Sequence, residues 1–234
     1  MRPMHPPIDS KLPRVGTTIF TVMSRLAAEH GAINLSQGFP DFEPPERLLD
    51  LASHHMRKGG AGNQYAPLAG LPSLRPAIAA KVSEYYGCMV DPENEITVTS
   101  GGTEALLCAI QAIVRAGDEV ILLDPAYDSY EPAVELAGGR AVHVPLQRPD
   151  FGIDWQRLSD ALTPRTRLLI VNFPHNPTGA TLEPADLEQL AERLRGTGVF
   201  LLADEVYEHM LFDGRRHQSL LRHAELAARS FVVS

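Results

Sequence analysis

Cysteine is scarce in this sequence. The 234 residues include only Cys88 and Cys108, which are too few and too far apart for a disulfide framework or a CxxC redox motif. Cys108 lies in an apolar helical run and is expected to pack there. The nine histidines show no HExxH or other short metal-ligand spacing, and His54 and His55 are typical of a solvated helix face. No metal site is predicted.

Long apolar runs and basic runs are also lacking. No apolar stretch approaches the roughly 20 residues that cross a bilayer. The first twenty residues, MRPMHPPIDSKLPRVGTTIF, are proline-rich and charged and lack the apolar segment of a secretory signal. The net charge is −8, from 21 basic and 29 acidic residues with interspersed signs, so we expect neither a nucleic-acid nor a membrane partner. These absences favour the cytoplasm.

Short apolar runs that alternate with helical patterns dominate the rest of the chain. Runs that are apolar on both faces suit strands covered by helices on each side. The predicted strands cover residues 95–100, 119–124, 140–146, 167–172, 199–203 and 230–234. The predicted helices cover residues 17–31, 72–87, 103–117, 129–139, 154–163 and 184–198. The alternation predicts an α/β fold with a mostly parallel, doubly wound sheet and flanking helices.

Ligands bind beyond the carboxyl ends of the strands in such a sheet. The segment SGGTEAL follows the first predicted strand, and its Gly101 and Gly102 precede a helix opened by Thr103. A helix start of this kind suits a phosphate, although an ordinary strand-to-helix turn has the same composition. Tyr127, in DPAYDSY after the next strand, has the shape to stack on a planar ligand or to fill the core.

Two further strand ends carry polar residues. Asn176, in FPHNPTGATL, belongs to a good turn sequence, and its amide is also able to donate to an anionic oxygen. Asp204 directly follows five apolar residues, so it is expected to be partly buried and to need a cationic or hydrogen-bonding partner. A protonated ring nitrogen would be such a partner, and capping of a following helix is the alternative. Together the strand ends match the binding needs of pyridoxal phosphate.

Seven segments in a fixed order carry a family resemblance from about residue 10 to the end. The chain resembles the fold-type I aminotransferases of the class I family, and it is most similar to the methionine aminotransferase and kynurenine–oxoglutarate transaminase branch. The segments are SKLPRVGTTIFTVMSRLA, INLSQGFPDF, NQYAPLAGLPSLR, ITVTSGGTEAL, DPAYDSYEP, NFPHNPTGATL and LLADEVYEH. The resemblance implies an N-terminal arm and small-domain segment over 1–44. It also implies a pyridoxal-phosphate-binding large domain over 45–234, truncated at its C-terminal end.

The resemblance assigns cofactor roles to particular residues. It implies that Gly101, Gly102 and Thr103 hold the cofactor phosphate and that Tyr127 stacks on the pyridine ring. It further implies that Asn176 and Tyr207 hydrogen-bond the ring's 3′-oxygen, while Asp204 pairs with the pyridine nitrogen. A carboxylate there favours the protonated ring, which withdraws electrons from the reacting carbon. Asp204 and Tyr207 are therefore the catalytic candidates.

The resemblance also implies substrate and subunit contacts. Gly38 would lie beside the substrate carboxylate, together with Asn176, and Tyr65 would reach the cofactor phosphate of a neighbouring subunit. The family is usually a homodimer with shared active sites. The substrates implied are an L-amino acid, of methionine, aromatic or kynurenine type, and a 2-oxo acid.

The chain departs from the family in lacking its central lysine. The lysine that forms the Schiff base with the cofactor is expected a few residues beyond the final SFVVS. The three lysines present, Lys11, Lys58 and Lys81, match nothing catalytic. Two arginines that the family uses on the cofactor phosphate and the substrate carboxylate are also absent. We therefore expect this chain to be inactive alone and to expose apolar surface.

Two alternatives stay open beside the transaminase. A carbon–sulfur lyase on the same scaffold would share the cofactor residues, although the segments GTTIFTVMSRLA and SQGFPDF favour the transaminase. A lysine-free pseudoenzyme that binds pyridoxal phosphate reversibly is the third reading.

Overall fold

A computed structural model describes residues 9–38 and 40–234. Residues 1–8 and 39, which belong to the predicted arm 1–44, lie outside the described residues. The helices are α1 (Ile19–His30), α2 (Glu46–Lys58), α3 (Leu74–Tyr86), α4 (Gly102–Ile113), α5 (Tyr130–Leu136), α6 (Trp155–Ala161), α7 (Pro184–Leu194) and α8 (Ala224–Ala227), with 3₁₀ turns η1 (Gly60–Asn63) and η2 (Leu220–Arg222). The strands are β1 (Glu119–Asp124), β2 (Arg140–Pro145), β3 (Thr166–Asn172), β4 (Phe200–Asp204) and β5 (Ser230–Val233).

The five strands form one parallel sheet in the order β2-β1-β3-β4-β5. The chain runs from β1 outward to β2, and then returns past β1 to build β3, β4 and β5 on the other side. The order therefore reverses between β1 and β3, where Asp124 and Asn172 end their strands. A reversal of this kind opens a crevice at the carboxyl edge. The predicted α/β fold is confirmed.

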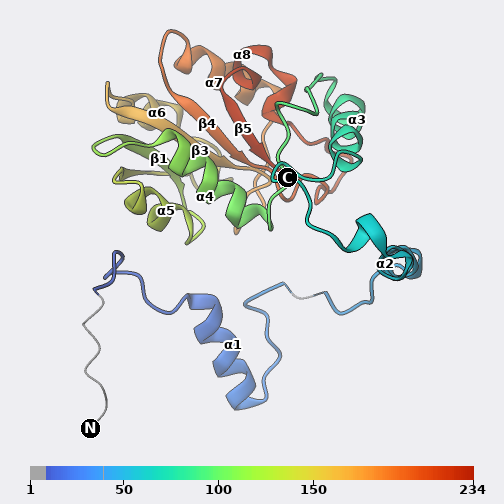
Figure 1. The fold of residues 1–234 in the computed structure, drawn as a ribbon. Coiled ribbons are helices and arrows are strands. Elements are labelled where there is room, and N and C mark those ends of the chain that lie inside the picture. The colour runs from blue at the N-terminus through green and yellow to red at the C-terminus, as the bar shows by residue number, and fades with distance from the viewer. Residues whose placement is uncertain (1–8, 39) are drawn as a thin grey trace.

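Helices cover both faces of the sheet (Figure 1). Leu169 and Val171 of β3 join the hydrophobic cluster that contains α6, α7 and α8. Leu168 and Ile170 join the opposite cluster, which contains α4 and α5. Successive side chains of a strand point to opposite faces, so a strand buried on both sides must be apolar at every position. This requirement explains the apolar run LLIV in the middle of β3.

The predicted strand over 95–100 is wrong. These residues include no strand; Ile96 is buried, and the Val98 N–H donates to the Ala69 carbonyl at 3.1 Å. Gly70 allows this approach, because a Cβ at its φ of +102° would lie 2.6 Å from a Val98 methyl group. The segment thus packs on a loop instead of joining the sheet. Cys108 is exposed on α4, so the expectation that it packs is also wrong.

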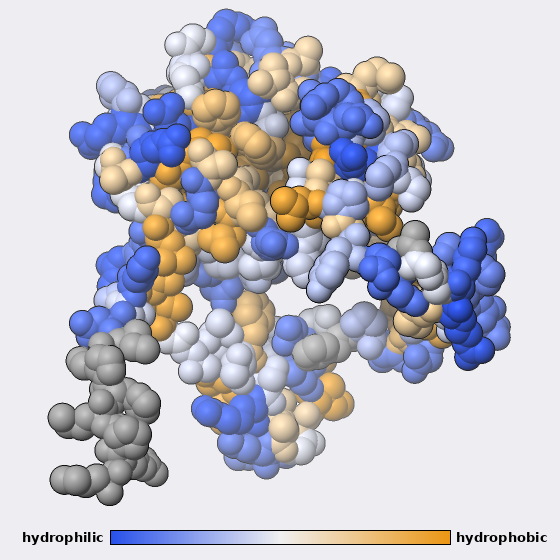
Figure 2. Space-filling view, viewed as in Figure 1, coloured by the Kyte–Doolittle hydropathy of each residue, from blue (hydrophilic) through white to orange (hydrophobic). Residues whose placement is uncertain are grey.

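The N-terminal part of the structure contributes little to the core. Neither α1 nor α2 has a buried residue, and both lie away from the sheet (Figure 1). His54 and His55 are on a helix, α2, as predicted. Leu35 is 89% and Leu68 is 100% exposed, and apolar side chains are visible on this face of both the sheet layers and the N-terminal part (Figure 2). The expected exposure of apolar surface is confirmed. Within residues 9–38 and 40–234, no helix is long and apolar enough to cross a membrane.

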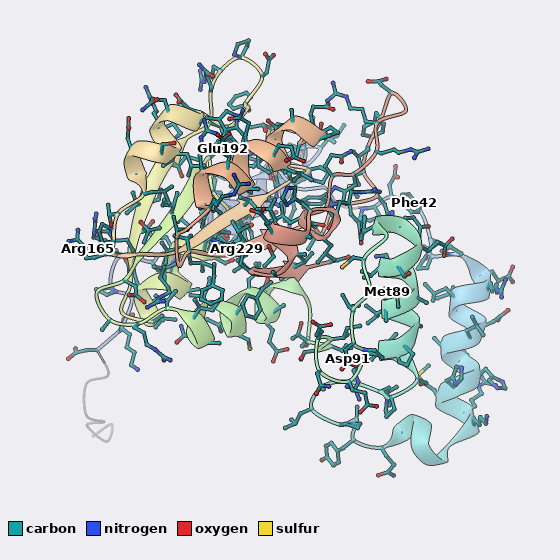
Figure 3. The ribbon with its side chains drawn as sticks, turned by 90° about the horizontal axis from the view of Figure 1, so that it is seen from above. Phe42, Met89, Asp91, Arg165, Glu192 and Arg229 are labelled. Atoms are coloured by element: carbon teal, nitrogen blue, oxygen red, sulfur yellow. The ribbon has the colours of Figure 1, made fainter. Side chains whose placement is uncertain are left out.

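A buried carboxylate anchors the opposite, amino-terminal edge of the sheet. Glu119 begins β1 and is 1% exposed, with hydrogen bonds from Arg140 at 2.8 Å, from Thr163 at 2.7 Å and from Arg165. The bond from Arg140, followed by those from Thr163 and Arg165, lowers the pKa of Glu119 from its ordinary 4.5 to about 2. Arg165 lies on the side of the molecule away from α3 and Met89 (Figure 3). This cluster joins β1, β2 and the start of β3.

Leu106 and Leu107 offer a direct test of the core on α4. Leu106 is 3% exposed and Leu107 is 39% exposed. Leu106→Ala is expected to reduce the free energy of unfolding by about 2–5 kcal/mol, because it removes buried methyl groups and leaves a cavity. Leu107→Ala should cost less than about 1 kcal/mol. Urea unfolding measures both, and equal losses would contradict this packing.

The Glu119 cluster predicts a pH dependence. Because the pKa of Glu119 is lowered on folding, its stabilisation is present above about pH 4.5 and is lost as the pH falls toward 2. Glu119→Gln should therefore be less stable than the parent chain at neutral pH, and the difference in stability between the two should become smaller in acid. Thermal unfolding of both proteins across this pH range measures this difference. Glu84→Gln, at an exposed position of α3, is the control, and its difference in stability from the parent chain should be the same at every pH.

Candidate active site at the carboxyl edge of the sheet

The site is built on the paired ends of β3 and β4. Asn172 and Asp204 are register partners, and the Asn172 side chain donates to the Asp204 carbonyl at 2.9 Å. The same side chain accepts a hydrogen bond from the Asn176 N–H at 3.0 Å. One buried amide therefore ties the turn after β3 to the end of β4. This tie places Asn176 beside the residues that follow Asp204.

Asp204 is a buried carboxylate, 5% exposed. Its Oδ2 accepts a hydrogen bond from the Tyr130 hydroxyl at 2.5 Å, and its Oδ1 lies 3.4 Å from the Val206 N–H. Burial raises the pKa of Asp204, and the hydrogen bond from Tyr130 opposes this rise without cancelling it. None of the groups that perturb it in the described part of the chain is a basic side chain. Such a carboxylate is suited to receive a cation from a ligand.

The alternative role of Asp204 as a helix cap is wrong. Turns rather than a helix follow β4. These turns bring the half-buried Tyr207 to Asn176, whose side-chain nitrogen lies 3.4 Å from the Tyr207 hydroxyl. The two side chains form a polar pair beside the buried acid.

Tyr127 and Tyr130 lie in the segment that follows β1, and Tyr130 contacts the same acid. Their ring centroids are 5.6 Å apart and their planes meet at 78°. Tyr127 is partly exposed, whereas Tyr130 is 3% exposed. Burial, followed by the neighbouring Asp204, raises the pKa of Tyr130 far above its ordinary range, so its hydroxyl remains a neutral donor. Tyr127, in contrast, is only partly buried against the cluster of α4 and α5.

The helix α4 begins at the same edge. Gly101 has a φ of +84°, which a residue with a side chain rarely adopts. A Cβ at Gly102 would lie 3.3 Å from Val206 and 3.4 Å from Val233, so the helix starts close to β5 and the turn after β4. The first N–H groups of a helix have no partner within it. Gly102 and Thr103 therefore present donors that suit a phosphate oxygen.

A second buried carboxylate supports this edge from behind. Glu208 is 6% exposed and accepts hydrogen bonds from Lys81 at 2.5 Å, from Tyr86 and from Ser234. Burial raises the pKa of Glu208, but the bonds from Lys81 and Ser234, together with the charge of Lys81, outweigh burial and lower it. The cluster joins α3, β5 and the turn that carries Tyr207. Lys81 is thus held in an ion pair with Glu208.

Three supporting residues escape the sequence reasoning: Tyr130, Asn172 and Glu208. Each is buried, and each acts through a partner far along the chain. The only signals in the sequence are a polar residue closing an apolar strand, in RLLIVN, and a second tyrosine in DPAYDSY.

Gly38 and Tyr65 are not brought to the strand ends by any contact in the described residues. Gly38 is exposed, and a Cβ added there would meet no atom within 4 Å. Tyr65 is 101% exposed. The predicted substrate and subunit contacts of these residues stay predictions.

The amide of Asn172 yields a prediction. Asn172→Ala removes both of its bonds and leaves two backbone groups unpaired, which should cost about 1–3 kcal/mol each in unfolding free energy. Asn94→Ala is the matched control, because Asn94 is exposed, and it should change stability by no more than about 0.5 kcal/mol. Urea unfolding measures the free energy of unfolding of both variants. Similar losses in the two would contradict the structural role of the Asn172 side chain.

The chain is similar in sequence and in fold to known proteins. The profile of the family described as aminotransferase class I and II matches residues 30–233. Methionine aminotransferase of Escherichia coli is 51% identical over 226 residues, which cover 97% of this chain and 58% of that protein. Human kynurenine–oxoglutarate transaminase 1 is 39% identical over 207 residues, which cover 84% of this chain and 49% of that protein. The chain thus spans between about half and three fifths of these curated relatives.

Solved structures agree with these relatives. A crystal structure of the Escherichia coli protein identified as a methionine aminotransferase superimposes with a TM-score of 0.92 at 50% identity, over 98% of this chain and 59% of that chain. N-succinyldiaminopimelate aminotransferase from Mycobacterium tuberculosis gives a TM-score of 0.91 at 43% identity, over 97% of this chain and 59% of that chain. The resemblance drawn from the seven segments is confirmed, and the chain belongs to the family of class I and II aminotransferases.

Proposed function

We propose that the strand ends of this chain form the floor of a pyridoxal phosphate site, and that the full-length form of the protein transfers amino groups between an L-amino acid and a 2-oxo acid. Class I aminotransferases depend on pyridoxal phosphate. The cofactor supplies an electron-withdrawing ring that stabilises the carbanion formed at the substrate's reacting carbon. The remaining roles belong to side chains of the site.

The observation that carries the proposal is the buried Asp204. Its carboxylate is removed from water with one neutral hydroxyl donor and no basic partner among its perturbing groups in the described residues. A protonated ring nitrogen would supply the missing positive charge. Asp204 in turn would hold the proton on that nitrogen, since an opposite charge favours the charged form.

The neighbouring groups fit the other parts of the cofactor. Gly101, Gly102 and Thr103 would bind the phosphate at the start of α4, and Tyr127 would stack on the ring. Asn176 and Tyr207, whose polar atoms lie 3.4 Å apart, would bind the 3′-oxygen. The hydrogen bond from the Asn176 amide to the Tyr207 hydroxyl is long and therefore weak, so an oxygen that accepts from both groups would readily replace it.

We further propose that this chain binds the cofactor without turning over substrate. Lys11 and Lys58 belong to the N-terminal part, and Lys81 is paired with Glu208. None is placed among the strand-end residues, so a covalent link and a general base would have to come from additional polypeptide. The domain division at residues 44 and 45, the homodimer and the contact of Tyr65 with a partner's cofactor belong to the same proposal.

The substrate class is taken from the relatives. Their names specify methionine, kynurenine with oxoglutarate, and N-succinyldiaminopimelate. We propose an amino acid of methionine, aromatic or kynurenine type. The carbon–sulfur lyase stays the alternative, and turnover that requires an added 2-oxo acid would favour the transaminase over it.

Asp204→Asn tests the cofactor site. Because the Asn amide carries no negative charge to pair with a protonated nitrogen, affinity for pyridoxal phosphate should fall about 10-fold to 100-fold in equilibrium dialysis. Asp150→Asn makes the same change at an exposed position and should leave affinity unchanged. Equal affinity of all three proteins would overturn the assignment of Asp204.

The intact mass of the natural protein separates the two forms of the proposal. A mass well above the 25.6 kDa of this chain would favour a longer aminotransferase with its lysine. A mass of 25.6 kDa would favour the lysine-free pseudoenzyme.

A further inference from the structure

The hydrogen bond between Tyr130 and Asp204 has no part in the roles assigned above. It joins residues 74 positions apart, and at 2.5 Å it is the closest polar contact of the buried acid. Tyr130 is 3% exposed, so its hydroxyl has been taken out of water to meet this one carboxylate. A buried hydroxyl needs a partner, and a buried carboxylate needs a donor.

We propose that Tyr130 is a positioning residue that fixes the Asp204 carboxylate for the ring nitrogen of pyridoxal phosphate and stabilises its anionic form. The inference rests on the proposed cofactor site and adds a residue to it. Tyr130 touches neither the cofactor nor the substrate in this proposal. It acts through Asp204 alone.

The geometry leaves one carboxylate oxygen for the ligand. Oδ2 is occupied by the hydroxyl of Tyr130, whereas Oδ1 has only the distant Val206 N–H at 3.4 Å among the described residues. A bond of 3.4 Å is weak and is readily exchanged for a charged donor. Fixing Oδ2 therefore leaves Oδ1 as the oxygen that is available to an incoming nitrogen.

The packing of Tyr130 makes this support rigid. Its ring belongs to the cluster of α4, α5 and the sheet that includes Leu106, Ala109 and Val134. Tyr127, three residues earlier, contacts this ring edge to face, with 5.6 Å between the two ring centroids. One short segment thus sets both the stacking ring and the orientation of the acid.

The directions of the pKa shifts of Asp204 and Tyr130 agree with this role. Burial and the neighbouring Glu205 raise the pKa of Asp204, and the Tyr130 bond opposes them. Tyr127 and Tyr207 are the other titratable groups that face the pair, and both join Asp204 in raising the pKa of Tyr130. Tyr130 therefore remains a donor while Asp204 is ionised. Without its hydroxyl, the acid would take up a proton at a higher pH.

A titration of Asp204 tests the proposal without cofactor. The carboxyl carbon of Asp204, assigned with Asp204→Asn, is followed by NMR against pH in the 234-residue chain. Tyr130→Phe should raise the pKa of Asp204. Tyr85→Phe is the matched control, because it removes the same hydroxyl from a side chain that is 51% exposed, and it should leave the titration in place. An unchanged titration in Tyr130→Phe overturns the proposal.

Binding of two probes locates the effect at the ring nitrogen. Affinity for pyridoxal phosphate at neutral pH should fall about tenfold in Tyr130→Phe, and the pH above which binding reaches its plateau should move upward. Affinity for the deaza analogue, which has carbon in place of the ring nitrogen, should not change. Equal losses for both probes would mean a general distortion of the site and would refute the role of Tyr130.

The two proposals fail in distinguishable ways. Absence of pyridoxal phosphate binding by the parent chain would defeat the cofactor site, while the titration would still show whether Tyr130 governs Asp204. If Tyr130→Phe does not fold, 3-fluorotyrosine at position 130 replaces it. That residue is a stronger donor, so it should lower the pKa of Asp204, and a rise or no change would contradict the proposal.

Discussion

The burial of the Asp204 carboxylate is the constraint on which the carboxyl edge of this structure depends. An ionised carboxylate removed from water is costly unless hydrogen bonds or an opposite charge compensate. Here Tyr130 binds the carboxylate and Asn172 binds the backbone carbonyl of the same residue. The end of β4 is therefore held by residues of α5 and β3, and the candidate cofactor contacts Tyr127 and Asn176 lie just before α5 and just after β3.

The two edges of the sheet use buried carboxylates differently. Glu119, at the amino edge, is surrounded by Arg140 and Arg165 and is held ionised, with a pKa lowered to about 2. Asp204, at the carboxyl edge, has no such cation within the part of the chain that the structure describes, and its pKa is raised. A satisfied ion cluster stabilises a fold, whereas a buried acid that lacks a cation is typical of a binding site. This difference separates the ion cluster of Glu119 from the candidate cofactor site of Asp204 within a single sheet.

The hydrogen bonds around Glu208 also explain why Lys81 is not placed among the candidate cofactor residues. Lys81 is the lysine placed against the sheet, and Glu208 holds it together with Tyr86 and Ser234. An amine that is held against a buried carboxylate is not free to attack another group. Lys81 therefore supports the turn that carries Tyr207 through its bond to Glu208.

The sequence by itself determined the alternation of strands and helices, the doubly wound sheet and the polar residues at its strand ends. These depend on local periodicity and on residue type, which can be read without a partner. Tertiary structure alone decided that Tyr130 would meet Asp204, that Asn172 would join two strand ends, and that residues 95–100 would pack on a loop. Each of those outcomes depends on a contact between distant parts of the chain, and no periodic pattern encodes which of several buried polar groups will become neighbours.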